Sequence, residues 1–444
     1  MNNIEFALHF AEHVEAGILF AALTLFVNYL LFRRYIYSLF DPLLFYTVLS
    51  AMAAAVVLYL YYFDLIRPFY LWSYLATQTA FVVAFQLIRP PAPARNPPPH
   101  RRSAYSGPIR VLYPLSVTLF VSAQVFVYSV SGLPILLTSR LEAFSTGGGY
   151  GFFSRLIFVT STISLCTAAY RLLLLNRRLG SRLLDYGVVA FCTIVAILSG
   201  SKGALLALVF TVSLAVYFAR RFHDVRAVER RIRGVFFFVV ALSFPVAFAA
   251  IYIQAGIEDF TELLSALAMR FFQTGEIFFM VYPDDVLSRL QDGNGLLALF
   301  YSPLGSLRLF SREELPVNLG LQAFWYHYDL DLISGPNARH NVFGLHYFGA
   351  VFSVFFSFLL GLLFSLSRNT AYRVLPATPV GLIVYVLIVN CAMFIEQDVS
   401  GQAIEYFFSV LLVFPVLYVV SAIPHIGRVR ARRTPLPSSA RHHA

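Results

Sequence analysis

The chain has 444 residues, of which 59% are hydrophobic and only 13% charged, and its mean hydropathy is +0.71. Soluble domains carry about 25% charged residues and disordered chains are poor in apolar residues, so both classes are excluded. The three cysteines lie in apolar stretches of a long chain, which excludes a disulfide scaffold. The composition predicts an all-α, polytopic integral membrane protein with one membrane domain that covers the whole chain.

The apolar stretches predict the transmembrane helices, because a spanning helix needs about 20 mostly apolar residues. Eleven stretches meet this pattern, and they are 16–32, 43–63, 69–88, 111–130, 156–170, 183–199, 204–219, 234–253, 342–366, 378–395 and 404–423. The fifth to seventh of them are short. The first span is expected to be retained, since residues 1–15 carry three glutamates and none of the positive charge of a signal peptide.

The distribution of Lys and Arg predicts the orientation, because these residues gather on the cytoplasmic side of membrane proteins. Of the 33 Lys and Arg residues, 24 fall in one alternating set of connections, namely 33–42, 89–110, 171–182, 220–233, 367–377 and 424–444. The N-terminus is therefore expected outside and the C-terminus in the cytoplasm. Most of the net charge of +10 is then a topology signal, and a nucleic-acid partner is not expected.

Four connections are long or unusual in composition. Residues 89–110 are rich in Pro and Arg and predict an extended cytoplasmic linker, and 424–444 form a basic cytoplasmic tail. On the outside lie 131–155 and the much longer 254–341, which carries 11 acidic residues and 5 arginines. Within the larger loop, 258–272 has apolar residues at helical spacing, and Pro and Gly divide the rest into short pieces.

The first candidate ligand site is the segment 138–151, TSRLEAFSTGGGYG, just beyond the fourth predicted span. Glycine-rich backbone can point several N–H groups at one anion, and a guanidinium adds paired donors. The residues of this hypothesis are Arg140, Gly147, Gly148, Gly149 and Gly151. The combination suits a phosphate or pyrophosphate, and the alternative is a flexible external turn with an interfacial arginine.

The second candidate is Lys202 in SGSKG, the only lysine in the chain, placed between two predicted spans. An ammonium at the membrane edge is costly unless it is paired or hydrated. Lys202 is therefore expected to bind an anion, with a snorkelling side chain at an outer turn as the alternative.

The third candidate is the segment 335–349, which runs into the ninth predicted span and contains the adjacent pair Arg339 and His340. His340 is the first choice for a group that exchanges protons near neutral pH. His346 is interpreted as a structural histidine. A zinc site, or any other metal, is not expected, because no cysteine lies near and the histidines lack ligand spacing.

Two further candidates lie on the outer side. Arg270, near Glu276, is either a ligand cation or an ordinary helix-face charge. Glu396 and Asp398 lie at the outer end of the tenth span and are candidates for a base or a counter-ion, or belong to an ordinary turn. The minority of cations on the outer face includes Arg140, Lys202, Arg270 and Arg339. An anionic ligand would explain why these cations depart from the topology rule.

At these residues the chain resembles the bacterial O-antigen polymerase (Wzy) family, whose members have two arginine-rich periplasmic loops, the larger lying late in the chain. Ten residues separate Arg140 from Gly151, a spacing seen in some members, and nine separate Arg339 from Gly349. The segment 200–206, GSKGALL, is similar to a GS(R/K)G segment often seen in this family.

The resemblance implies a metal-independent, inverting glycosyltransferase without a cofactor, in the bacterial inner membrane with its active site facing the periplasm. Its substrates are implied to be glycans on undecaprenyl pyrophosphate: a growing chain is the donor and a single repeat unit the acceptor. Arg140, Lys202, Arg270 and Arg339 would bind the pyrophosphate, and His340, ahead of Glu396, would deprotonate the acceptor. The aromatic run 324–328 (FWYHY) is a candidate for stacking on sugar rings. A polysaccharide chain-length regulator is a possible partner.

Two alternatives remain open. An O-antigen ligase would transfer the glycan to lipid A core with similar residues. A flippase or transporter of lipid-linked sugars would not be an enzyme, and it predicts charged residues buried within the spans together with repeat symmetry. The predicted spans hold few ionisable residues and no repeat is evident, which favours an enzyme.

Overall fold

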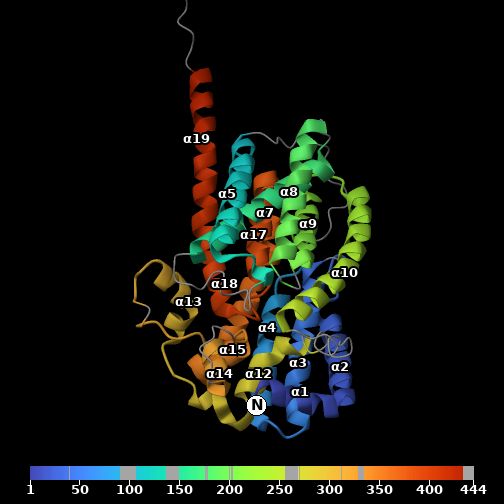
Figure 1. Ribbon diagram of the computed structural model, residues 1–444, viewed down its shortest axis with the longest axis vertical. Helices are drawn as coiled ribbons and strands as arrows, with labels where there is room; N and C mark the ends of the chain where they lie inside the picture. Colours follow the sequence, from blue (N-terminus) through green and yellow to red (C-terminus); the bar gives the residue numbers. More distant parts are fainter. Residues whose placement is uncertain are drawn as a thin grey trace, which may run out of the picture.

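The computed structural model describes residues 1–39, 41–90, 107–136, 150–175, 179–199, 201, 204–255, 269, 271–311, 313–328 and 335–433. Throughout these ranges the chain forms helices and turns, with no strand (Figure 1). The α-helices are α1 (Asn3–Glu12), α2 (Val14–Phe32), α3 (Pro42–Tyr62), α4 (Pro68–Gln86), α5 (Ile109–Ser131), α7 (Tyr150–Leu174), α8 (Leu179–Leu198), α9 (Ala204–Ala219), α10 (Arg226–Ala255), α12 (Glu276–Val281), α13 (Gly295–Ser306), α14 (Leu319–His327), α15 (His340–Ser365), α16 (Ala371–Val374), α17 (Pro379–Ala392), α18 (Val399–Glu405) and α19 (Phe414–Arg433). Short 3₁₀ and π segments are η1 (Pro134–Leu136), η2 (Gln273–Gly275), η3 (Pro283–Arg289), η4 (Leu366–Thr370) and η5 (Tyr406–Val413).

Each predicted span overlaps one of these helices, and the all-α prediction is confirmed for the described residues. Six of the described helical stretches are long and apolar enough to cross a membrane, namely Val14–Phe32, Pro42–Tyr62, Ile109–Leu136, Gly151–Leu174, His340–Val374 and Val399–Pro424. The count of eleven spans and the orientation stay predictions. The expected amphipathic helix at 258–272 lies mostly outside the described residues.

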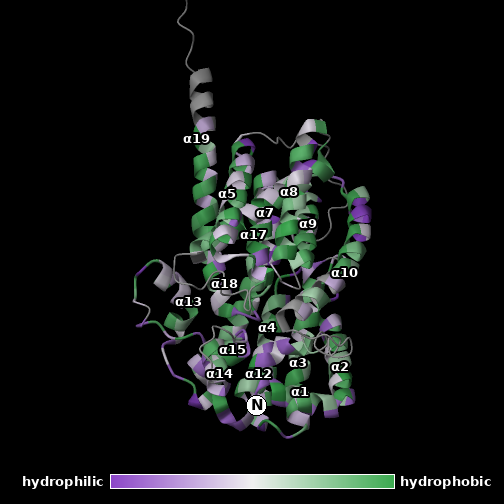
Figure 2. Ribbon diagram, viewed as in Figure 1, coloured by the Kyte–Doolittle hydropathy of each residue, from purple (hydrophilic) through white to green (hydrophobic). Residues whose placement is uncertain are grey.

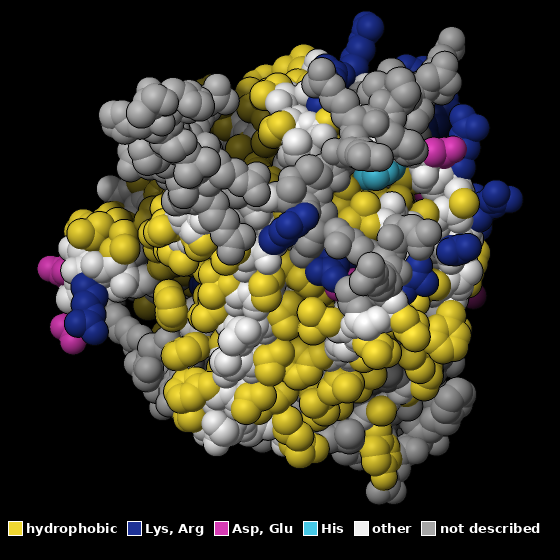
Figure 3. Space-filling view, turned by 90° about the horizontal axis from the view of Figure 1, so that it is seen from above, with side chains coloured by type: hydrophobic (Ala, Val, Ile, Leu, Met, Phe, Trp, Pro, Cys, Tyr) yellow, Lys and Arg dark blue, Asp and Glu magenta, His cyan; other side chains and the backbone are white. Residues whose placement is uncertain are grey.

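The outward faces of several helices are apolar, which is the pattern of a protein surrounded by lipid (Figure 2). On α2, Leu19 is 65% exposed and Phe26 61%, and on α15 Val351 is 79% exposed. Seen from above, hydrophobic side chains reach the rim of the molecule over much of its outline (Figure 3). Helices that are apolar on the outside as well as the inside are characteristic of membrane proteins. The chain is therefore a membrane-embedded helical protein.

The helices gather in two groups, which Figure 1 shows one above the other. The lower group contains α1 to α4, α12, α14 and α15, and the upper group contains α5, α7 to α9, α17 and α19. Helix α1 was not predicted, and it begins with a capping box between Asn2 and Glu5. Its Phe6 ring stacks on Phe279 of α12 at a centroid distance of 4.1 Å, so the N-terminus packs against the large loop.

Helix α15 is two helical segments joined at Gly349, whereas the sequence predicted one continuous span over 342–366. Gly349 has φ 73° and ψ 176°, a conformation that is almost restricted to glycine. The segments fold back on each other: His340 Nδ1 lies 2.9 Å from Ser357 Oγ, although a straight helix would separate these residues by about 25 Å. The hairpin carries Arg339 and His340 into the interior of the lower group.

The second segment of α15 carries a row of small buried residues four apart, Ser353, Ser357, Gly361 and Ser365. Ser353 and Ser357 contact the first segment of α15, whereas Gly361 and Ser365 contact α4. A Cβ atom on Gly361 would lie only 2.1 Å from the carbonyl oxygen of Phe81, so no larger residue fits there. Ser365 Oγ donates a hydrogen bond to the carbonyl oxygen of Phe85 at 2.6 Å. Small residues at this spacing let membrane helices approach closely.

Ser365→Ala is expected to lower the free energy of unfolding by about 1 kcal/mol, because it removes a buried hydrogen bond between two helices. The measurement is thermal unfolding in detergent. Ser421→Ala is the matched control, since Ser421 is equally buried but bonds only to Leu417 of its own helix. Equal losses in the two variants would show that the contact between α4 and α15 does not depend on Ser365.

Candidate functional site

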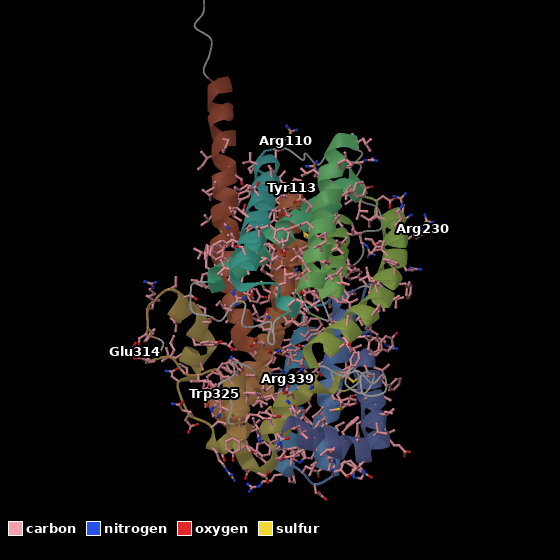
Figure 4. The ribbon with its side chains drawn as sticks, in the orientation of Figure 1. Arg110, Tyr113, Arg230, Glu314, Trp325 and Arg339 are labelled. Carbon is pink, nitrogen blue, oxygen red and sulfur yellow. The ribbon has the colours of Figure 1, made fainter. Side chains whose placement is uncertain are left out.

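The centre of the lower group holds a buried ion pair between Arg339 and Glu396. Arg339 immediately precedes α15, and Glu396 lies in the turn between α17 and α18. Their side chains are 1% and 0% exposed, and Arg339 lies in the interior in Figure 4. Arg339 Nη1 also donates to the carbonyl oxygen of Thr274 at 3.1 Å, which ties the pair to the large loop.

Glu396 is held by hydroxyl groups from α3. The hydroxyl of Tyr46 donates to Glu396 Oε2, and Ser50 Oγ donates to Oε1 at 3.0 Å. Burial is the largest single influence and raises the pKa of Glu396, but Arg339, His340 and these two hydroxyls together outweigh it, and the pKa lies below its usual value. The carboxylate is therefore ionised and neutralises Arg339.

His340 lies beside this pair and is also completely buried. Its ring stacks on Phe81 at a centroid distance of 5.0 Å, and its backbone N–H donates to the carbonyl oxygen of Glu396 at 3.1 Å. Nδ1 contacts Ser357, whereas Nε2 has no hydrogen-bond partner. His340 as the base stays a prediction; a substrate would reach it only after the helices around it move.

The structure brings three predicted site residues together: Arg339, His340 and Glu396. Gly151 lies in the first turn of α7, with open space where a Cβ atom would be. Six predicted site residues lie outside the described residues, and they are Arg140, Gly147, Gly148, Gly149, Lys202 and Arg270. Their proposed contacts with pyrophosphate stay predictions.

The other expected side chains have local roles. Glu276 begins α12 and accepts a hydrogen bond from Asn3 Nδ2 at 2.7 Å. Asp398 caps α18 by accepting from the Gly401 N–H at 2.9 Å. His346 Nε2 contacts the carbonyl oxygen of Gln291 at 3.1 Å, and Trp325 of the aromatic run is 43% exposed.

A cavity of about 500 Å³ lies between α3, α5, α7, α8, α9, α17 and α18. Most of its wall is apolar, and the polar groups on it include Thr211, Asn390, Gln402 and Glu405. Tyr46 also lines the cavity, so one side chain connects this space to the Arg339–Glu396 pair. An apolar cavity of this size with a few polar groups is typical of a small-molecule or lipid site.

Residues that flank two predicted ligand segments also line the cavity. Ser199 and Ala204, on either side of Lys202, belong to its wall. Ser154 also belongs to it and follows the glycine-rich segment 138–151 on α7. The wall of the cavity therefore includes residues that adjoin both segments in the sequence.

A second ion pair borders this cavity and was missed from the sequence. Arg155 of α7 contacts Glu405 of α18, and Ser409 Oγ donates to the second carboxylate oxygen of Glu405 at 3.2 Å. Arg155 ends the predicted outer loop 131–155, and Glu405 lies at the start of the predicted span 404–423, so neither was a candidate site residue. No local signal in the sequence joins two residues 250 positions apart.

Two more buried ion pairs lie within the bundle. Arg368 Nη2 lies 2.6 Å from Asp41 Oδ2, and Arg171 Nε lies 3.1 Å from Asp185 Oδ2. From the sequence, Arg171 and Arg368 were expected only to set the orientation of the chain in the membrane. The helical bundle therefore contains more buried charge than expected, because these arginines bind carboxylates on neighbouring elements.

No protein-family model, curated protein or solved structure matches this chain. The likeness to O-antigen polymerases therefore rests on the short motifs around Arg140, Lys202 and Arg339 and on the arrangement of spans and loops.

Proposed function

We propose that this protein is an O-antigen or polysaccharide polymerase of the bacterial inner membrane. In this proposal it is a metal-independent, inverting glycosyltransferase that works at the periplasmic face. It transfers the growing glycan from undecaprenyl pyrophosphate to an incoming lipid-linked repeat unit and releases undecaprenyl pyrophosphate. The observation that carries the proposal is the apolar cavity that borders the Arg155–Glu405 pair and reaches Tyr46.

This cavity suits a lipid-linked substrate because it joins two environments. Its apolar wall on α7, α8 and α9 matches part of a polyprenyl chain. Its polar groups suit the charged and sugar-bearing end, and its wall includes residues that adjoin Lys202 and the glycine-rich segment in the sequence. Departure of the pyrophosphate builds negative charge on oxygen, which preorganised cations stabilise. Arg339 would join them only by exchanging Glu396 for the substrate anion.

The test is to incubate the purified protein in liposomes with undecaprenyl-pyrophosphate-linked repeat units alone and to separate the glycans by size. A ladder of longer glycans is expected. If a product forms only after lipid A core is added, the protein is a ligase, and the polymerase proposal is wrong.

A lipid-linked sugar flippase is the second candidate, and the buried ion pairs favour it. Charges inside a membrane bundle are costly and often mark transport pathways. The pairs Arg171–Asp185, Asp41–Arg368 and Arg339–Glu396 provide three such sites. Liposomes that contain a fluorescent lipid-linked repeat unit distinguish the two: transfer between leaflets without a ladder identifies a flippase.

A further inference from the structure

We infer that Glu405 is the base that takes the proton from the acceptor sugar hydroxyl, in place of His340 or Glu396. This inference rests on the proposed polymerase function and deepens it. The inference follows from the positions of the carboxylates relative to the cavity. It also follows from two buried polar atoms beside Glu405 that have no hydrogen-bond partner.

Access distinguishes the three candidate bases. A general base must come within hydrogen-bond distance of the proton that it removes. His340 and Glu396 are 0% exposed, and neither lines the cavity. Glu405 lies on the cavity wall, and its side chain is 15% exposed. Among the described residues of that wall it is the single carboxylate.

The surroundings of Glu405 hold its carboxylate in place and leave it room to accept a proton. Arg155 contacts Oε1, and Ser409 donates to Oε2 at 3.2 Å. A carboxylate offers about four lone-pair positions, so two donors leave acceptor capacity for a substrate hydroxyl. Arg155 is therefore a positioning residue for Glu405.

Gln402 lies one helical turn before Glu405 on α18 and also lines the cavity. Residues three apart share a helix face, so the two side chains face the same space. Gln402 Oε1 is buried without a hydrogen-bond partner, and so is Arg155 Nε. Buried polar atoms are normally paired. A sugar hydroxyl beside Glu405 would pair with Gln402 Oε1, whereas Arg155 does not line the cavity and holds the Glu405 carboxylate.

Loop helices extend this polar region on the side of α13. Asp398 accepts from Ser400 Oγ at 3.3 Å, and the amide of Asn318 donates to Ser400 Oγ and to the hydroxyl of Tyr301, each at 3.5 Å. Carboxylate, amide and hydroxyl groups are the side chains that recognise sugar hydroxyls. None of these four side chains lines the cavity, so they would contact only a part of the acceptor that extends from the cavity toward the large loop.

The step balances without any further reagent. The acceptor O–H gives its proton to Glu405, and its oxygen forms a bond to the anomeric carbon of the donor on the face opposite the leaving group. The bond between that carbon and the pyrophosphate oxygen breaks, and its electron pair leaves with undecaprenyl pyrophosphate. The configuration at the anomeric carbon is inverted, and Glu405 returns its proton to water.

The test is Glu405→Gln in the full-length protein, assayed with lipid-linked repeat units. Loss of a general base is expected to lower the turnover by about 10²–10⁴-fold. Binding of undecaprenyl pyrophosphate is expected to stay within about twofold of wild type. Glu314→Gln is the control for the change in charge, because Glu314 lies at the outer edge of the loop (Figure 4) and does not line the cavity. Unreduced turnover in Glu405→Gln would overturn the inference.

Azide separates loss of the base from misfolding, because it is an anionic nucleophile that needs no deprotonation. Glu405→Gln with added azide is expected to convert the lipid-linked donor to a glycosyl azide of inverted configuration. An inactive variant that binds the donor but forms no azide product would contradict the role as base. A wild-type protein that makes no glycan ladder would refute the proposed function itself, which is a distinct result.

Arg155 is tested by comparing two substitutions. Arg155→Gln is expected to lower kcat at nearly unchanged KM for the donor, because it releases the Glu405 side chain. Arg155→Lys keeps the charge and is expected to restore part of kcat. A rise in KM for the donor with kcat unchanged would show that Arg155 binds the donor and does not position Glu405.

Discussion

Glu396→Gln is expected to lower the free energy of unfolding by about 3–5 kcal/mol, because it leaves the buried guanidinium of Arg339 without a counter-charge. The glutamine still accepts from Tyr46 and Ser50, so the main change is the lost negative charge. Denaturant or thermal unfolding in detergent measures the effect. Glu314→Gln, at an exposed carboxylate, is expected to leave stability nearly unchanged.

The double variant Arg339→Met/Glu396→Gln removes both charges and is expected to recover most of the lost stability. Replacing a buried ion pair with apolar or neutral groups is often close to neutral. If the double variant folds but makes no glycan ladder, Arg339 has a role beyond holding the fold. A single Glu396→Gln variant as stable as Glu314→Gln would contradict the structure, since no buried pair would then have been broken.

Gly349→Ala is expected to destabilise the protein by about 1–3 kcal/mol and to reduce activity. At φ 73° and ψ 176° a side chain is strained whatever space surrounds it, and no other atom lies within 4 Å of a Cβ atom at this position. The strain opposes the fold-back of α15 that carries Arg339 and His340 to Ser357. Thermal unfolding and glycan length together measure the outcome.

Gly187→Ala in α8 is the matched control for Gly349→Ala. A Cβ atom there also has nothing within 4 Å, but Gly187 lies inside a regular helix, where alanine is favoured over glycine. Gly187→Ala is therefore expected to be neutral or slightly stabilising. Equal behaviour of the two variants would mean that the hairpin does not depend on the left-handed backbone at Gly349.

The hairpin supplies a physical reason for a glycine ten positions after Arg339. In the sequence, the spacing of Arg339 and Gly349 only resembled a motif of the O-antigen polymerase family. In the structure the residues between Arg339 and Gly349 form the first segment of α15, and Gly349 permits the reversal of chain direction that follows this segment. Hydropathy predicts one continuous apolar span over 342–366, because a single residue with an unusual φ does not change the composition of the segment.

The sequence by itself determined that the chain is helical and membrane-embedded, and it located each of the long apolar helices. Those properties depend on local composition, because every backbone polar group in lipid must be paired within its own helix. It also singled out Arg339, His340 and Glu396 by their unusual position near predicted span ends.

Only the tertiary structure decided which of these groups meet. Arg339 and Glu396 are 57 residues apart, and Arg155 and Glu405 are 250 apart, so each pair depends on how whole helices pack. The cavity likewise has walls from seven helices, and it is the packing that leaves Glu405 on its surface and buries His340 and Glu396. Hydropathy records whether a residue tolerates lipid, but the contact between two polar groups depends on the faces that the helices turn toward each other.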